Sequence, residues 1–182
     1  LRLALPLENL GSGKFIFVCA QNDLFATNHP YDFEEDLKTI KRLMDVHEHI
    51  AKFPNNKYLF QTKCLAMMSL FYRTHKKYLT DNITLCITLE QINEVIEIYA
   101  IIPFKEIDHK HKHITIEPIM KFNLNAFVDA IELIKPEQIN IGADSGKNNL
   151  PEPTSEEVHQ LIDTLKNLGF NIHIKDNLKR LL

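Results

Sequence analysis

The chain has 182 residues, of which 45% are hydrophobic and 25% are charged, and its formal net charge is -3. This composition is typical of one globular domain with a hydrophobic core, so residues 1–182 are interpreted as a single domain. The acidic balance does not indicate a nucleic-acid partner, although a local basic groove stays compatible with it. No apolar run reaches the roughly 20 residues of a membrane-spanning helix, so we expect no membrane partner.

The three cysteines of the chain, Cys19, Cys64 and Cys86, are odd in number and far apart. None belongs to a CxxC pair, so neither a disulfide framework nor a paired metal motif is indicated. Isolated thiols of this kind are typical of the reducing cytosol, where cysteine packs as a small apolar residue. We therefore expect a cytoplasmic protein.

Short segments rich in β-branched or aromatic residues are expected to form strands. In chain order they are residues 15–18, 57–60, 83–87, 113–116, 138–141 and 170–174. Between them, apolar residues recur at helical spacing, as in residues 37–47, 124–134 and 158–168. Thr154 followed by Glu157 predicts the start of the last helix, and Gly169 predicts its end.

Alternating strands and helices predict an α/β fold of repeated βα units, in which the strands are parallel and the crossovers are right-handed. An open doubly wound sheet and a full or partial barrel are both compatible with this pattern. We expect a partial, TIM-like (β/α) barrel of about six parallel strands.

Polar side chains follow each predicted strand, and ligands bind at the carboxyl ends of the strands in such folds. We therefore expect a site for a small-molecule ligand there. The candidate binding residues are Asn22, Asp23, Thr62, Lys63, Thr88, Glu90, Glu117, Asn140, Asp144 and Lys175. Asp23, Glu117 and Asp144 are the foremost candidates, because each closely follows an apolar strand. The alternative is that these groups cap helices and order loops.

Short strings at these strand ends resemble radical S-adenosylmethionine (SAM) proteins of the phage-associated, three-cysteine-cluster type. The strings are Phe17–Val18 with Asn22–Phe25, Tyr58–Lys63, Ile116–Pro118, Asn140–Ser145 and Leu150–Pro153. The resemblance implies a partial barrel that binds SAM beside a [4Fe–4S] cluster, which cleaves SAM to a radical that abstracts hydrogen from a substrate. By position it implies Asn22 and Asp23 near the methionyl group, Thr88 and Glu90 near the ribose, Glu117 and Asp144 beside the adenosine or substrate, and Lys63 and Lys175 beside a carboxylate or phosphate.

The cysteines depart from this family. Its cluster is bound by a CxxxCxxC string, which this chain lacks, and Cys19, Cys64 and Cys86 belong to three different strand regions. Because the chain also begins at Leu1 rather than Met, we expect an N-terminal cluster-bearing segment to be missing. A [4Fe–4S] cluster is then expected only if upstream cysteines exist.

Three interpretations stay open. The first is a radical-SAM-type enzyme core without its cluster loop. The second is a degenerate, catalytically inactive barrel that binds a small molecule or a protein. The third is an unrelated α/β binding domain. No G-x-S-x-G elbow or paired nucleophile supports a hydrolase.

Two histidine patterns are candidate sites. His109, His111 and His113 alternate with lysines. An extended segment would place the three rings on one face, but the lysines would repel a cation, so a solvated loop is favoured. His47 lies on the apolar face of its helix and is interpreted as a residue at the edge of the core.

Overall fold

The computed structural model describes residues 9–19, 22–27, 33–93, 95–146 and 148–182. At its centre is a 6-stranded, all-parallel sheet in the order β1-β2-β3-β4-β5-β6. The strands are β1 (Phe15–Val18), β2 (Lys57–Thr62), β3 (Ile83–Thr88), β4 (Lys112–Ile116), β5 (Gln138–Ile141) and β6 (Ile172–Ile174).

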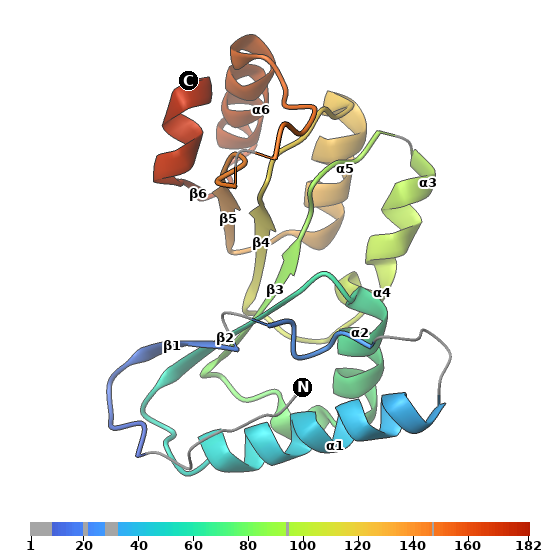
Figure 1. The fold of residues 1–182 in the computed structure, drawn as a ribbon, viewed down its shortest axis with the longest axis vertical. Helices are drawn as coiled ribbons and strands as arrows, with labels where there is room; N and C mark the ends of the chain where they lie inside the picture. The colour runs from blue at the N-terminus through green and yellow to red at the C-terminus, as the bar shows by residue number, and fades with distance from the viewer. Residues whose placement is uncertain (1–8, 20–21, 28–32, 94, 147) are drawn as a thin grey trace.

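The order of the strands decides between the two architectures that the sequence left open. A doubly wound sheet reverses its order at a switch point, whereas a (β/α) barrel adds each strand beside the previous one. Here each strand pairs with the next one along the chain, and the strand direction turns progressively from β1 to β6 (Figure 1). The sheet is a curled half-barrel, which confirms the predicted partial barrel of repeated βα units.

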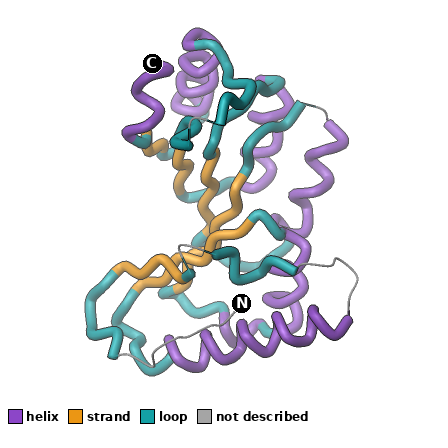
Figure 2. The backbone as a smooth tube through the Cα atoms, viewed as in Figure 1, coloured by secondary structure: helices purple, strands orange, loops and turns teal. Residues whose placement is uncertain are grey.

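The described helices alternate with the strands along the chain and leave one side of the curled sheet without a helix over it (Figure 2). The α-helices are α1 (Phe33–Ile50), α2 (Leu65–Thr74), α3 (Val95–Ile98), α4 (Ile102–Lys105), α5 (Leu124–Ile134) and α6 (Ser155–Asn167). The 3-10 helices are η1 (Lys76–Tyr78), η2 (Tyr99–Ile101) and η3 (Asp176–Leu181). None of the helices in the described part of the chain is long and apolar enough to cross a membrane.

The ends of α5 and α6 follow from their capping residues. Asn123 caps α5 by accepting a hydrogen bond from the Ala126 amide, and Lys135 ends this helix in the left-handed region at φ 52°. Thr154 and Glu157 form a complete capping box at the start of α6. The predicted start of α6 is therefore confirmed, and the glycine expected after its end, Gly169, has a φ of 85°.

The two faces of the sheet differ in polarity. Ile114, Ile116, Ile139 and Ile141 point to one face and are fully buried against the helices. The alternate residues point to the concave face, where His113 and Asn140 are only half-buried. The half-barrel thus keeps an apolar layer under its helices, and its concave surface is polar along β4 and β5 but carries the exposed rings of Phe15 and Phe17 along β1.

Candidate site at the carboxyl ends of the strands

Because all strands are parallel, the predicted binding residues lie at one edge of the sheet. Their hydrogen bonds divide them into two groups. The first, after β1, β2 and β3, comprises Asn22, Asp23, Thr62, Lys63, Thr88 and Glu90. The second, in or after β4, β5 and β6, comprises Glu117, Asn140, Asp144 and Lys175.

Asp23 orders the first group. Its Oδ2 accepts hydrogen bonds from the Thr62 hydroxyl at 2.7 Å and from the Lys63 amide at 2.9 Å, and its Oδ1 accepts from the Phe25 amide at 3.0 Å. The Thr62 hydroxyl in turn accepts from the Cys64 amide at 2.7 Å. The Asp23 carboxylate therefore fixes the backbone around Lys63, and much of its hydrogen-bonding capacity is used within the protein.

Lys63 and Glu90 carry the accessible charges of this group. Their side chains form an ion pair and are 61% and 34% exposed. Next to this pair, the Gln61 side-chain amide donates to the Thr88 hydroxyl at 2.9 Å, which links β2 to β3 on the concave face. The ion pair is thus held at the rim by ordered neighbours while its charged groups remain open to solvent.

Two cavities flank this ion pair and share Lys63 and Thr88 in their walls. One, of about 280 Å³, lies beside Asn22, Asp23 and Gln61, and its walls also include Phe17 and Cys19. The other, of about 570 Å³, lies between the start of α2 and the segment before α4. Its walls include the apolar side chains Leu65, Ala66, Ile92, Ile101 and Met120. Two cavities, each with both polar and apolar walls, therefore meet at one pair of opposite charges.

In the second group, Glu117 accepts a hydrogen bond from Asn177 Nδ2 at 2.7 Å and forms an ion pair with Lys175. Asn177 Nδ2 also donates to the Ala143 carbonyl at 2.8 Å. A Cβ at Gly142 would lie 2.7 Å from Glu117 Oε1, so only glycine leaves room for this arrangement. The sequence pattern did not single out Asn177 for a role, because it lies beyond the strand end in η3.

The Asp144 side chain stabilises the loop that follows β5. Its carboxylate accepts hydrogen bonds from the Gly146 amide at 2.9 Å and from the backbone and side-chain amides of Asn148. Burial opposes ionisation of this carboxyl, but these hydrogen bonds outweigh burial and hold its pKa below the usual range. The same loop is tied to η3 through Arg180, which pairs with Glu152 and donates to the Asp144 carbonyl. In this arrangement Asp144 is a loop-ordering residue.

The concave face below the rim holds Asn140 and Cys86. Asn140 accepts from Gln138 at 2.7 Å and donates to the Thr115 hydroxyl at 3.4 Å. The Cys86 thiol lies 3.4 Å from the same hydroxyl, and burial raises its pKa to about 11. These groups form a packed polar layer under the second group of rim residues.

The three thiols do not fit a [4Fe–4S] cluster. Cluster binding requires thiolates, whereas Cys86 is fully buried with a raised pKa and burial also raises the pKa of Cys19. Among the residues that the structure describes, no three His, Cys, Asp or Glu side chains are placed to hold a metal ion. We therefore assign no step to a cluster.

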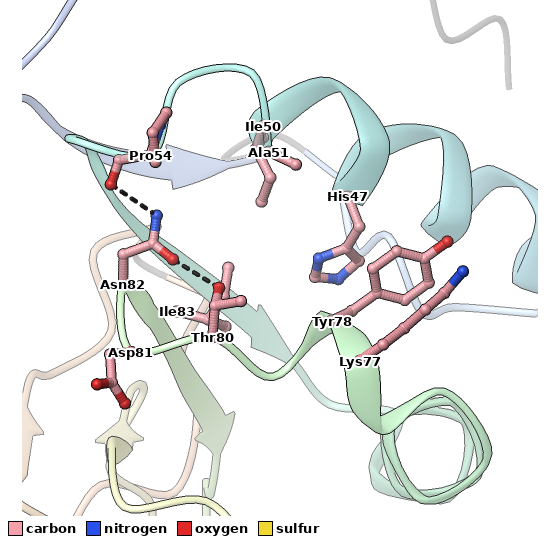
Figure 3. Close-up of a pocket in the computed structure, with 10 residues that line it drawn as sticks. All are labelled: His47, Ile50, Ala51, Pro54, Lys77, Tyr78, Thr80, Asp81, Asn82 and Ile83. Carbon is pink, nitrogen blue, oxygen red and sulfur yellow. Dashed lines mark hydrogen bonds between the residues drawn. The ribbon is translucent and has the colours of Figure 1, made fainter.

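A further cavity, of about 330 Å³, lies at the opposite, amino end of the sheet and is lined by His47 and Tyr78 (Figure 3). His47 stacks on the Tyr78 ring with a centroid distance of 4.9 Å, and its Nε2 lies 3.0 Å from the Tyr72 hydroxyl. Burial lowers the pKa of His47 to about 3, so the ring is neutral. His47 is 2% exposed and therefore lies in the core itself, whereas the sequence predicted a position at the edge of the core.

The alternating histidines have separate partners. His109 Nε2 donates to the Ile83 carbonyl at 2.7 Å, and His111 Nδ1 lies 2.9 Å from Glu137 Oε2. His113 lies in β4, within the predicted strand 113–116. The first two rings thus join the start of β4 to its neighbours.

Comparisons with models of known protein families, with curated proteins and with solved structures return no match. The geometry of the half-barrel and its rim is therefore the basis on which a function is inferred.

Proposed function

We propose that this half-barrel binds SAM at the carboxyl ends of β1, β2 and β3, as the ligand-binding core of a radical-SAM-type protein. The observation that carries the proposal is the Lys63–Glu90 ion pair at the junction of two cavities that share Lys63 and Thr88, the larger of which has several apolar side chains in its walls. SAM has matching chemistry, because it joins a charged methionyl group to a ribose diol and a flat, largely apolar adenine.

Three parts of SAM, the carboxylate, the ribose and the adenine, have a counterpart in this arrangement. Lys63 would bind the methionyl carboxylate, and Glu90 would accept hydrogen bonds from the ribose hydroxyls. Helix α2 begins at Leu65, two residues after Lys63, and its N-cap residue Cys64 makes no side-chain cap hydrogen bond, so the first N–H groups of the helix add positive potential for the carboxylate. The larger cavity, with its apolar walls, would take the adenine.

Exchange of the ion pair for ligand contacts costs little free energy. Solvent-exposed pairs contribute about 0–1 kcal/mol to stability, and the Lys63 side chain is 61% exposed. Hydrogen bonds to charged groups are worth about 1.5–3 kcal/mol, so contacts with a carboxylate and a diol would exceed what the pair loses. Asp23 supports this exchange by holding the Lys63 backbone in place.

The cysteine geometry favours a second candidate function, which is binding without radical chemistry. The described thiols do not fit a cluster, so the half-barrel on its own would bind SAM or a related nucleoside as a ligand rather than cleave it. Both candidates require the same rim site. They differ in whether cluster cysteines are supplied to it.

Calorimetric titration of SAM tests the proposal, with 5′-methylthioadenosine as a ligand that keeps the ribose and adenine but lacks the carboxylate. Lys63→Met is expected to weaken SAM about tenfold, in line with loss of one charge-assisted hydrogen bond, and to leave methylthioadenosine unchanged. Glu90→Gln is expected to weaken both ligands.

The matched control is Glu106→Gln, which removes one partner of another exposed ion pair, Arg73–Glu106. Its affinity for both ligands should equal that of the wild type. Absence of SAM binding to the wild type, or equal SAM affinity in wild type and Lys63→Met, would overturn the proposed function.

A further inference from the structure

The cavity of about 330 Å³ at the amino end of the sheet has no role in the proposed function (Figure 3). It lies between the C-terminal end of α1 and the segment that runs from η1 to the first residue of β3. The apolar and aromatic side chains in its walls are His47, Ile50, Ala51, Pro54, Tyr78 and Ile83. An apolar body is therefore the kind of ligand that these walls can bury.

The polar groups of the walls are engaged within the protein. The Thr80 hydroxyl donates to Asn82 Oδ1 at 2.6 Å, and Asn82 Nδ2 donates to the carbonyls of Pro54 and Asn56 at 3.2 Å and 3.0 Å. The His47 ring is neutral, because burial lowers its pKa to about 3. Since an ordered water needs two to four polar partners, water in this cavity is held weakly and an apolar group can displace it.

Two charged side chains flank the cavity, and they differ in their availability. Asp81 points away from His47 and Ile50 (Figure 3) and forms an ion pair with Lys110 at 3.3 Å. Lys77 is exposed, and its Nζ lies 4.8 Å from the centroid of the Tyr78 ring. A contact with the ring face leaves the N–H groups of the ammonium able to donate to an anion. The mouth of the cavity is therefore suited to a negatively charged group at Lys77.

We propose that this cavity binds a compact aromatic carboxylic acid, with its ring system against the end of α1 and its carboxylate at Lys77. The size is suitable, because a cavity of roughly 150 Å³ is enough to hold benzene and this one can take a bicyclic ring. An aromatic ligand also gains from edge-to-face contact with the Tyr78 ring. The C-terminal end of α1 carries partial negative charge, which favours the orientation with the carboxylate toward Lys77. This site is independent of the SAM site proposed for the rim.

Naphthylacetate and its uncharged amide, naphthylacetamide, provide the test, since they have nearly the same shape and differ in charge. Both are titrated into the ¹⁵N-labelled whole chain, and the wild type is expected to bind the acid more tightly than the amide. Lys77→Met should reduce this preference about fivefold, as expected for the loss of one exposed ion pair. Lys76→Met changes the neighbouring exposed lysine of η1, which does not line the cavity, and should keep the wild-type preference.

A second variant and the wild-type spectra test where the ligand binds. Ala51→Phe places a large side chain at an exposed position in the cavity wall and is expected to abolish binding of both compounds. In the wild type, the amide shifts should centre on Ala51 and on Tyr78 to Ile83, a result that does not depend on the folding of any variant. Failure of naphthylacetate to bind the wild type, shifts centred elsewhere, an unchanged preference in Lys77→Met, or undiminished binding to a folded Ala51→Phe variant would overturn the proposal.

Discussion

The Thr62 hydroxyl donates a 2.7 Å hydrogen bond to Oδ2 of Asp23, and this bond joins the segment after β1 to the carboxyl end of β2. The same carboxylate oxygen accepts from the Lys63 amide. Asp23, which the sequence predicted as a ligand-binding residue, thus has a structural role, because its carboxylate fixes the backbone at Lys63.

Asp23→Ala is expected to lower the free energy of unfolding by about 1–3 kcal/mol, because a hydroxyl and two backbone amides lose their acceptor. Urea denaturation measures this change. Asp81→Ala is the matched control, since the Asp81 side chain is 87% exposed and forms an ion pair with a surface lysine, Lys110. Equal stability of the two variants would contradict the ordering role of Asp23.

Gly142→Ala is expected to disrupt the Glu117–Asn177 contact, because the new Cβ would lie 2.7 Å from Glu117 Oε1 and 2.9 Å from Asn177 Oδ1. Overpacking of this kind costs about 1–3 kcal/mol, which thermal or urea unfolding would detect. Ser145→Ala, an exposed change in the same loop, should leave stability near that of the wild type. A Gly142→Ala variant as stable as Ser145→Ala would show that the cluster tolerates the methyl group.

His47 is expected to make the fold sensitive to mild acid. Burial lowers its pKa in the folded state from 6.5 to about 3, so between these pH values the unfolded chain binds a proton that the folded chain does not. Stability should therefore fall as the pH falls below about 6.5, by up to about 1.4 kcal/mol per pH unit from this residue.

The comparison variant for this effect is His47→Phe, which keeps an aromatic ring in the stack with Phe60 and Tyr78. Chemical denaturation at a series of pH values from 7 to 4 gives the slope for each protein, over a range of about three pH units. The variant should have the shallower slope. Identical slopes would mean that His47 does not control acid sensitivity.

Anaerobic reconstitution with iron and sulfide is expected to leave this chain colourless. Cys86 is buried beside Thr115 with a raised pKa, and the other two thiols belong to different strand regions, so three thiolates are not brought together. The absorbance spectrum after desalting measures the outcome. A stable brown protein would contradict this reading of the cysteines.

The fold was predictable because its determinants are local. Apolar strands such as Ile114–Ile116 alternate with helices that carry their own boundary signals, as Thr154 and Glu157 do for α6, and parallel strands follow from that alternation. The ends of some elements were not predictable. In the segment before β4, Pro103 divides the helical region into short pieces rather than one helix.

The roles of the rim residues were less predictable because their partners are distant in sequence. Asp23 and Thr62 are 39 positions apart, and Glu117 and Asn177 are 60 apart. Sequence spacing could place all four near strand ends, but it could not show which polar groups would satisfy one another.

Titration of the ¹⁵N-labelled chain with SAM, followed by amide NMR, tests the central claim most directly. We predict chemical-shift changes centred on Lys63, Thr88 and Glu90, at the carboxyl ends of β2 and β3. Absence of any change, or changes confined to the amino-end cavity around Tyr78 (Figure 3), would contradict a SAM site at this rim.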